Sequence, residues 1–430
     1  MNSAASPAVA LLASLALAGC GSDTAGSDLR DGVLIGGSGA IPAAIQGMHY
    51  QSGDQSGFTN ASGTFRYHEG DSVQFSLGAL QFEAVPGAPA ASPYQLASGG
   101  SCRADDRLTI VLQILQSCDA HGTLDDGLQL PEVAVPAEFN LVRSIAATDL
   151  AATITATCSG AAVVPATEAL DRFIRLMNDE TWAEAPSDEF LLPALVSRTQ
   201  GTATDGVSWY FSSANRLERT NGAFEAQADN LQPIPKDVRT AGGNHIGDVD
   251  VHGGLLYGPI EDGPDYLHAV IVTYDAATLE PTGNVYPLPH EQQTQGVPWV
   301  AVDGPRQVVY SAEWDPVDRI NVYDLADPSK ALRTIVLSEP LGRIQGAKVY
   351  GGVMYAARDD DEKSVWKIDL DTGIVMRLLA FGTTDSELEG IALIGSSDAA
   401  QMRVLNIVLP AVTFEKRVRT RQPLRDLVCR

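Results

Sequence analysis

The chain reads His245-Ile-Gly-Asp-Val-Asp-Val-His-Gly-Gly-Leu-Leu-Tyr257 at the start of a pattern that then recurs. Each copy combines a Gly, an alternating apolar run, a tight turn and a second apolar run that contains a Tyr. The shared Gly stands at positions 247, 296, 346 and 390, so the copies begin 49, 50 and 44 residues apart. A β-rich repeat of roughly 40–50 residues is typical of a β-propeller, in which each copy forms one blade. The pattern therefore predicts a mainly β C-terminal region with propeller architecture.

The number of blades follows from extending the repeat in both directions. Tyr210 precedes Tyr257 by 47 residues, which places one more copy before the first. A propeller must close its ring, because an open ring would leave exposed strand edges. Residues 188–198 could supply either a closing outer strand or part of a sixth blade. We expect five blades, with a sixth left open, at residues 200–243, 244–292, 293–342, 343–386 and 387–420.

Composition limits the classes of partner. The 430 residues are 44% hydrophobic and 19% charged, which is typical of a globular protein with a real core. The formal net charge is −25, so the phosphates of nucleic acid would be repelled. We therefore expect no nucleic-acid partner.

The N-terminus has a pattern that predicts an export signal. Residues 8–18 form a mostly apolar run that is too short to span a bilayer, and this run leads into Leu17-Ala-Gly-Cys20. This tetrapeptide resembles the lipobox of bacterial lipoproteins, although residues 1–7 contain no Lys or Arg. The resemblance implies cleavage before Cys20, lipidation of Cys20 and a stable membrane anchor. Because Gly21 rather than Asp follows, it also implies an outer-membrane location in the cell envelope.

The remaining cysteines predict disulfides. Four cysteines in an exported protein favour two disulfides over a metal site, because the chain has no Cys-x-x-Cys pair. A pair among the first three would leave one to join the C-terminal cysteine, but the spacing does not decide the connectivity. The four are Cys102, Cys118, Cys158 and Cys429.

A small α+β domain is expected ahead of the propeller. The segments 62–67 and 73–77 alternate apolar and polar residues around Gly70-Asp71 and predict a hairpin. Residues 60–131 resemble a domain that is common in bacterial surface lipoproteins. Apolar stripes predict helices over 108–115, 139–146 and 167–177. The expected organisation is a signal peptide at 1–19, a flexible tether at 20–39, the α+β domain at 40–185 and the propeller at 186–430.

One acidic turn in this domain has two interpretations. Asp119, Asp125 and Asp126 offer the hard oxygen ligands that calcium prefers. However, His121 stands where an ion-binding loop would place a carboxylate, and no bidentate Glu follows at the required distance. Termination of the preceding helix explains the same residues.

The candidate site lies at the axis of the propeller. Aligning the copies on their shared Gly places Gln295, Gln345 and Glu389 at one level of the central channel. In the copy that contains Gly247, His245 lies one step before this level, and Asp248 lies directly after the Gly. These side chains could simply satisfy water and backbone groups in a wet channel, or they could hold a ligand or a Ca²⁺ ion.

A resemblance supports the second interpretation. Leu388-Glu-Gly-Ile-Ala392 is similar to the start of inner strands in calcium-dependent propellers of the lactonase, esterase and phytase-like kinds; the repeats also resemble YVTN and NHL propeller repeats. In the calcium-dependent families the Glu binds an axial calcium that polarises an ester or phosphate oxygen. The Asn ligands usual in those families are replaced by Gln at the matching positions here.

A second group of polar residues follows the second strand of three successive copies and should share one face of the ring. Such acidic loops with a Trp and an Arg could hold a sugar or a cationic ligand, or could be ordinary solvated turns. The group comprises Glu261-Asp262, Glu313-Trp-Asp315 and Arg358-Asp-Asp-Asp361.

No motif assigns a reaction. The chain lacks a G-x-S-x-G elbow, a dinucleotide-binding fingerprint and a P-loop, so no catalytic residue is identified. The first hypothesis is a lipid-anchored envelope protein whose propeller binds a small-molecule or protein ligand or acts as a scaffold. The alternative is a calcium-dependent hydrolase or lactonase with His245 as base. Fold alone does not choose between them.

Overall fold

The computed structural model describes residues 29–36, 43–120, 127–191, 196–382 and 385–429, and these form two compact units. The N-terminal unit contains residues up to 179 together with 423–430, and the second unit contains residues 180–422. Two of our predicted boundaries are therefore corrected. Residues 180–185 belong to the second unit because they form a strand there, and the C-terminal residues 423–430 return to the first.

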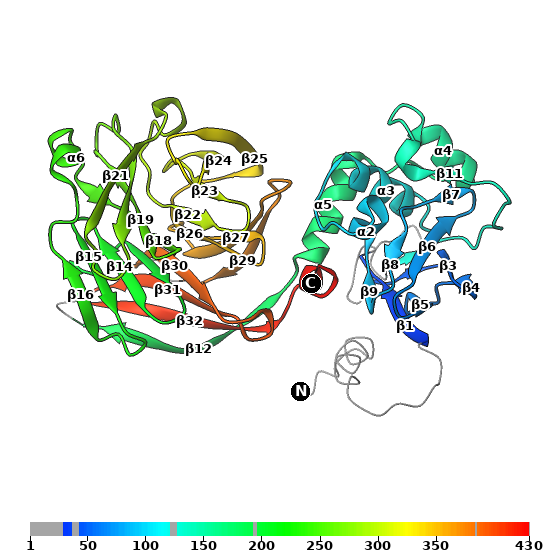
Figure 1. Ribbon diagram of the computed structural model, residues 1–430, viewed down its shortest axis with the longest axis horizontal. Coiled ribbons are helices and arrows are strands. Elements are labelled where there is room, and N and C mark those ends of the chain that lie inside the picture. Colours follow the sequence, from blue (N-terminus) through cyan, green and yellow to red (C-terminus); the bar gives the residue numbers. More distant parts are fainter. Residues whose placement is uncertain (1–28, 37–42, 121–126, 192–195, 383–384, 430) are drawn as a thin grey trace. The chain divides into compact units, whose positions relative to one another are not determined.

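The N-terminal unit combines small sheets with helices, as expected for an α+β domain (Figure 1). The elements are β1 (Leu29–Leu34), β2 (Ile45–Gln46), β3 (His49–Ser52), β4 (Gln55–Phe58), β5 (Thr64–His68), β6 (Ser72–Leu77), β7 (Leu80–Gln81), β8 (Val85–Pro86), β9 (Ala90–Ala91), β10 (Leu128–Gln129), β11 (Asn140–Leu141), α2 (Pro93–Ser98), α3 (Asp106–Ser117), α4 (Leu150–Thr157), α5 (Ala166–Met177) and α7 (Leu424–Val428). The largest sheet has the order β11-β7-β6-β3-β4, with β8 also paired to β6. Helix α3 begins after Asp105, whose side chain accepts a hydrogen bond from the amide of Leu108 at 2.9 Å and so caps the helix.

Three local predictions in this unit were wrong. The strands β5 and β6 do not form a hairpin; β5 pairs with β1 and β6 with β3, and the rings of Phe65 and Phe75 meet edge to face at 5.1 Å. Residues 139–146 form the short strand β11 and a 3-10 turn rather than a helix. The expected tether at 20–39 includes β1, whose apolar residues Val33 and Leu34 are buried.

Both predicted disulfides are present, and both lie within the N-terminal unit. Cys118 joins Cys158 across 40 residues. Cys102 joins Cys429 across 327 residues, so the C-terminal segment is covalently tied to the N-terminal unit. The side-chain Nε2 of Gln95 donates a further hydrogen bond of 2.7 Å to the backbone carbonyl of Val428. Cys20, His121, Asp125 and Asp126 lie outside the described residues.

In the described part of the chain, the second unit contains five antiparallel sheets, each of four strands or, in one case, five (Figure 1). Consecutive segments of the repeat form each sheet, because each apolar run is followed by a short turn that returns the chain beside it. A short helix, α6 (Lys236–Thr240), follows the first sheet. The sheets are β13 (Gly201–Thr204), β14 (Trp209–Ser213), β15 (Arg216–Thr220), β16 (Ala226–Asn230); β17 (His245–Ile246), β18 (Asp250–His252), β19 (Leu255–Glu261), β20 (Val270–Asp275), β21 (Pro281–Pro287); β22 (Ala301–Asp303), β23 (Val308–Ser311), β24 (Val317–Asp324), β25 (Ala331–Leu341); β26 (Ile344–Tyr350), β27 (Val353–Arg358), β28 (Ser364–Asp369), β29 (Val375–Ala380); and β30 (Glu387–Ile394), β31 (Gln401–Val408), β32 (Ala411–Arg421), β12 (Thr181–Phe190).

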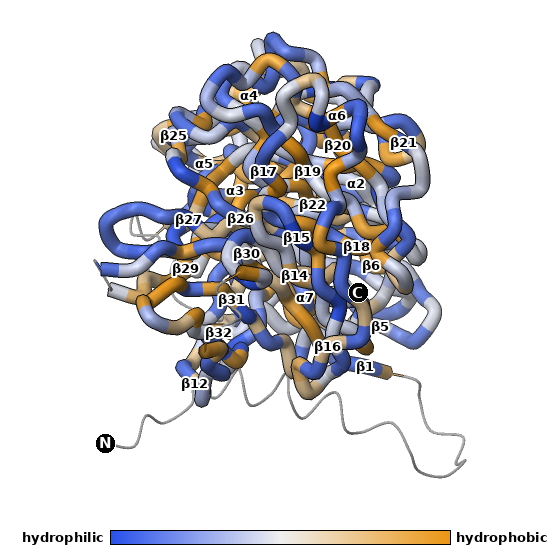
Figure 2. Tube along the Cα trace, turned by 90° about the vertical axis from the view of Figure 1, so that its left-hand side faces the viewer, coloured by the Kyte–Doolittle hydropathy of each residue, from blue (hydrophilic) through white to orange (hydrophobic). Residues whose placement is uncertain are grey.

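These sheets are arranged as in a propeller. The innermost strands contact one another in the order β13, β18, β22, β26 and β30, and β30 contacts β13 again. Five buried hydrophobic clusters fill the spaces between neighbouring sheets. Hydrophobic and hydrophilic residues alternate along the trace of the chain (Figure 2). The mainly β, propeller-like character predicted from the repeat is confirmed.

The first and last parts of this unit are joined by β12. This strand precedes all others of the unit in sequence, yet it pairs antiparallel with β32 in the last sheet. Asp188–Phe190 thus belong to an outer strand of that sheet. An aromatic cluster continues the junction, with Phe190 and Phe414 packed against Phe211 of the first sheet at 5.8 and 5.6 Å between ring centroids.

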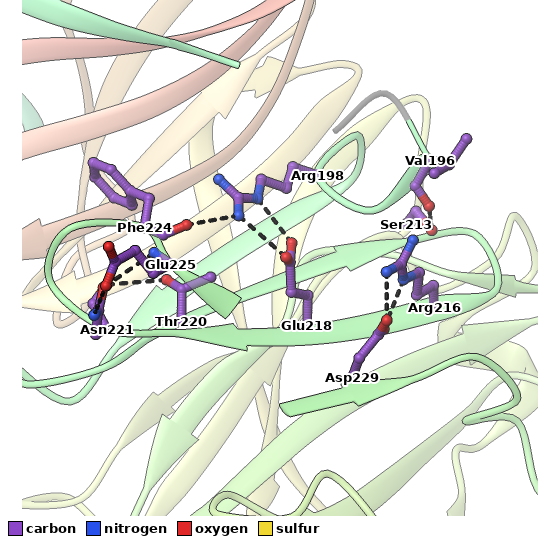
Figure 3. Close-up of polar contacts among 10 residues, drawn as sticks. All are labelled: Val196, Arg198, Ser213, Arg216, Glu218, Thr220, Asn221, Phe224, Glu225 and Asp229. Carbon is purple, nitrogen blue, oxygen red and sulfur yellow. Dashed lines mark hydrogen bonds and ion pairs between the residues drawn. The ribbon is translucent and has the colours of Figure 1, made fainter. Parts of the chain in front are cut away.

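A buried arginine reinforces this junction (Figure 3). Arg198 forms a two-pronged ion pair with Glu218 at 2.8 and 3.1 Å and also donates to the carbonyl of Phe224. Its guanidinium lies 4.4 Å from the ring centroid of Phe190 and 4.7 Å from that of Phe211. The charge is therefore both paired and stacked, which offsets the cost of burying it.

The structure contains no helix, among the described residues, that is long and apolar enough to cross a membrane.

Candidate functional site

The predicted site residues lie in or shortly before the first part of each innermost strand. We call this end of the ring the mouth and define it by Gln200, His245, Gln295, Gln345 and Glu389. Each of these residues directly precedes the repeat Gly, or lies two positions before it in the case of His245. The second strand of each sheet ends at the mouth as well, as the pairing of His245 with Glu261 shows.

Glycines allow the innermost strands to converge tightly just below the mouth. A Cβ atom on Gly346 would lie 2.7 Å from Oδ2 of Asp248 and 2.8 Å from Cα of Gly390. One on Gly390 would lie 2.7 Å from Oδ1 of Asp248, and one on Gly201 would lie 2.5 Å from Cα of Asp248. Since no side chain fits in these positions, the axis at this level is packed with protein atoms and is not a wet channel.

Asp248 is fully buried and is already engaged. Its Oδ2 lies 2.5 Å from Nζ of the buried Lys348, and its Oδ1 accepts from the amide of Thr202 at 2.8 Å. Burial raises the pKa of Asp248 to about 7, although Lys348 and the Thr202 amide oppose that shift. The carboxylate that we proposed as a ligand is thus held by a lysine 100 residues further along the chain.

Unlike the buried carboxyl group of Asp248, that of Glu389 is only partly hydrogen-bonded. It is fully buried, and within the described part of the chain its Oε2 has no hydrogen-bond partner. Its Oε1 receives one long hydrogen bond of 3.4 Å from Nε2 of Gln200. Burial raises the pKa of Glu389 well above its ordinary value, and the charges of Glu387, Asp359 and Asp248 raise it further. Lys363 opposes this shift. Glu389 is therefore favoured in its protonated form.

His245 is linked to Glu389 through a side chain that we had not predicted. Nε2 of His245 lies 2.8 Å from Oε1 of Gln200, and Nδ1 of His245 lies 3.1 Å from Oε1 of Glu261. The other oxygen of Glu261 accepts from the amide of Val297 at 2.7 Å. The structure therefore brings His245 and Glu389 together on either side of one carboxamide.

The sequence contains a signal for Gln200. The dipeptide Gln200-Gly201 repeats Gln295-Gly296 and Gln345-Gly346, and Gly201 precedes Gly247 by 46 residues. Extending the Gly alignment by one copy would have placed Gln200 at the mouth. Lys348 has no comparable signal, because the matching positions of the other copies are not basic.

The two remaining predicted residues are less enclosed. The side chain of Gln295 is exposed, and its backbone carbonyl accepts from the amide of Trp314 at 3.2 Å. Gln345 is half-buried at the start of β26. Neither Gln295 nor Gln345 contacts Glu389 in the way that Gln200 does through its hydrogen bond.

The second predicted group of polar residues lies at the same end of the ring. Oδ1 of Asp359 accepts from Nζ of Lys363 at 2.6 Å and from the amide of Leu388 at 3.0 Å, and Asp359 also pairs with Arg343. Glu313 accepts from the amide of Thr294 at 2.6 Å. These acidic loops are therefore tied to neighbouring segments of the mouth.

The predicted calcium ligands do not form a calcium site. Calcium takes six to eight oxygen ligands. Asp248 is instead paired with Lys348, and both ring nitrogens of His245 lie within hydrogen-bonding distance of other side chains. Among the residues described, no group of three or more His, Cys, Asp or Glu side chains is placed to hold a metal ion. The residues present do not fit the ion.

Several solved structures resemble part of this chain at low sequence identity. No family model matches the chain, and no curated protein matches it. Glutaminyl cyclase from Myxococcus xanthus aligns with 14% identity over 56% of this chain and 97% of its own, at a TM-score of 0.42. A gluconolactonase from Xanthomonas campestris aligns with 12% identity over the same shares, at a TM-score of 0.35. The computationally designed Ika8 protein covers 51% of this chain and 70% of its own with 11% identity, at a TM-score of 0.29. Scores this low carry no argument about activity, so the architecture rests on the strand pairing above.

Proposed function

We propose that this chain is a lipid-anchored protein of the bacterial cell envelope whose second unit is a five-bladed propeller that binds a small ligand at its mouth. The observation that carries the binding proposal is the buried Oε2 of Glu389. A buried polar atom without a partner costs about 1–3 kcal/mol, and native proteins keep few of them. A ligand atom that forms a hydrogen bond with Oε2 removes this cost.

The five-bladed ring belongs to the proposal as well. Support comes from the five sheets, from the hydrophobic clusters between each neighbouring pair and from the contact of β30 with β13. In this arrangement β12 is the fourth strand of the last blade. Residues 188–190 then complete a blade and do not begin a sixth.

The anchor is supported by the sequence Leu17-Ala-Gly-Cys20. Lipid on Cys20 would hold the protein at a membrane, and Gly21 favours the outer membrane. The calcium-dependent hydrolase that we weighed as an alternative is not carried forward, because Asp248 and His245 are engaged within the protein.

Calorimetric titration tests the binding site with three kinds of small polar probe: ethanolamine as a cation, glucose as a neutral solute and acetate as an anion. We expect at least one probe to bind the unmodified protein and to bind Glu389→Gln about tenfold more weakly. The matched control is Glu280→Gln, an exposed residue after β20, which should bind as the unmodified protein does. If no probe binds, or if binding is the same in Glu389→Gln, the proposal is rejected.

Trp314 offers an independent reporter. It is partly exposed at the mouth, beside Gln295. Occupation of the site should change its fluorescence, and Trp314→Phe should lose that signal while the calorimetric titration still detects binding.

A further inference from the structure

The positive charges around Glu389 are already paired. Lys363 and Arg343 both pair with Asp359, and Lys348 pairs with Asp248 beneath the mouth. Each of these two carboxylates therefore has at least one cation of its own. The mouth has no spare cation among these residues to offer a further carboxylate.

Glu389 and its neighbour Glu387 on β30 remain without such a partner. Glu387 and Glu389 form no ion pair with any described residue, and Glu389 is completely buried. The neighbouring acidic groups of Glu387, Asp359 and Asp248 all act on Glu389 in the same direction, against its ionised form. Negative charge therefore prevails around Glu389, and the nearby cation Lys363 is already paired with Asp359.

Gln200 shows what kind of group the site accepts. Its carboxamide NH₂ donates to Glu389, but the contact is long at 3.4 Å, and Gln200 itself is only half-buried. The same carboxamide is held from the other side by His245. Gln200 is thus a partly exposed side chain whose donor contact with Glu389 is weak.

We propose, on the basis of the function proposed above, that the ligand of this site carries a protonated amine, which displaces the carboxamide of Gln200 and pairs with Glu389. An ammonium group has three donors and one positive charge, so it satisfies Oε2 and replaces the long hydrogen bond to Oε1. Neither a neutral hydroxyl nor an anion supplies the missing charge.

Aromatic side chains at the mouth suit the same ligand. The ring of Tyr266 lies beside Glu261, close enough that a Cβ atom on Gly296 would be 2.9 Å from Tyr266 and 2.1 Å from the Glu261 carboxylate. Trp314 contacts the adjacent residue of the same segment, since its amide donates to the carbonyl of Gln295. Both aromatic residues are partly exposed. An organic cation entering beside them would be attracted by the faces of their rings.

Binding of an amine should release a proton. Burial and the neighbouring carboxylates raise the pKa of Glu389 above its ordinary value, whereas an ammonium group favours the ionised carboxylate. The groups that face this carboxyl are Glu387, Asp359, Asp248 and Lys363, with His245 behind Gln200. In buffers of different ionisation enthalpy, calorimetry should therefore report proton release that is lost in Glu389→Gln.

The deciding experiment compares amines with neutral molecules of the same shape. The probe pairs are putrescine with butanediol and phenethylamine with phenethyl alcohol, titrated into the full chain near neutral pH. We expect each amine to bind about tenfold more tightly than its alcohol, and Glu389→Gln to lose that preference. Gln200→Ala should bind the amines more tightly, since no carboxamide has to be displaced, and Glu280→Gln should behave as the unmodified protein.

The outcomes separate this inference from the proposed function. If the alcohols bind through Glu389 and the amines show no advantage, the site stands and the amine is rejected. Amine binding that is unchanged in Glu389→Gln would mean general attraction to an acidic surface, and it would reject both. Weaker amine binding in Gln200→Ala would show that Gln200 is part of the ligand contact, and it would contradict displacement.

Discussion

Two buried carboxyl groups near the mouth differ in whether a single neighbouring side chain pairs with them. Asp248 and Glu389 lie at nearby positions of the same repeat alignment, and the sequence treats them alike. Lys348 pairs with Asp248, whereas Glu389 receives only the long hydrogen bond from Gln200. The pairing of Asp248 depends on a lysine from another sheet, which no local pattern reveals. Sequence alone could therefore locate both residues but could not say which of them is available.

Glu389→Gln should make stability less dependent on pH. The ordinary pKa of this carboxyl is 4.5, and folding raises it well above that value. Above pH 4.5 the unfolded chain therefore loses the proton first, so the folded state becomes less stable as pH rises. The carboxamide that replaces the carboxyl in this variant cannot titrate, and it resembles the protonated carboxyl in shape.

Urea denaturation at about pH 4 and about pH 8 measures this effect. The unmodified protein should lose more stability between the two values than the variant does. Parallel losses in both proteins would show that Glu389 does not hold its proton in the folded state.

Asp248→Asn should destabilise the protein strongly, because it removes the carboxylate that pairs directly with the buried ammonium of Lys348. Breaking one side of a buried ion pair typically costs about 3–5 kcal/mol. The double variant Asp248→Asn with Lys348→Met should recover much of that loss, since the unpaired charge is gone. Chemical denaturation of the two single variants and the double variant tests this, and additive losses would contradict a direct pair.

At the scale of the strand, the repeat predicted the sheets better than the flanking sequence predicted the N-terminal unit. The alternating runs of each copy became strands because one face meets the next sheet in a shared hydrophobic cluster. In the N-terminal unit the same alternation in Thr64–His68 and Ser72–Leu77 suggested a hairpin. Those strands instead bury Phe65 and Phe75 against each other from different sheets, a tertiary contact that alternation cannot distinguish from side-by-side pairing.

The repeat Gly is a packing requirement of the innermost strands. In Gly346→Ala the new methyl group would meet Asp248 and Gly390 at 2.7 and 2.8 Å, so an inner strand must move. Overpacking of this kind costs about 1–3 kcal/mol. Gly222→Ala is the matched control, because no atom lies within 4 Å of the added Cβ. Thermal or urea denaturation compares them, and equal stability of the two variants would disprove tight convergence at the axis.

For the whole molecule, the sequence indicated two domains and two disulfides, but it placed the C-terminus in the wrong unit. The last residues group with the N-terminal unit, where Cys429 is joined to Cys102. Four cysteines allow three connectivities, and none of them can be excluded from spacing alone. The return of the chain could therefore be suspected from the sequence but not established.

The proposed anchor makes a separate prediction at this scale. Cys20→Ser removes the thiol that would carry the lipid, so the protein should move from the membrane fraction to the soluble fraction. Fractionation of cells that express each form, with immunoblotting, measures this. Cys102→Ser is a suitable control, because it removes a different cysteine and should leave the membrane association unchanged. Retention of Cys20→Ser in the membrane would contradict the lipoprotein assignment.

The pairing of β12 with β32 also has a consequence for how the chain is made. Thr181 and Thr420 are 239 residues apart, yet their hydroxyl groups lie 2.9 Å from each other. A chain that emerges N-terminus first presents β12 before any other strand of the ring, and this strand must wait without a partner until nearly all the rest has followed. Such distant pairing closes slowly, because the entropy of a long loop is lost before the contact forms. Completion of the last sheet should therefore be the late, rate-limiting event of maturation, and a chain that ends before residue 411 would leave β12 as an open edge for another chain to occupy.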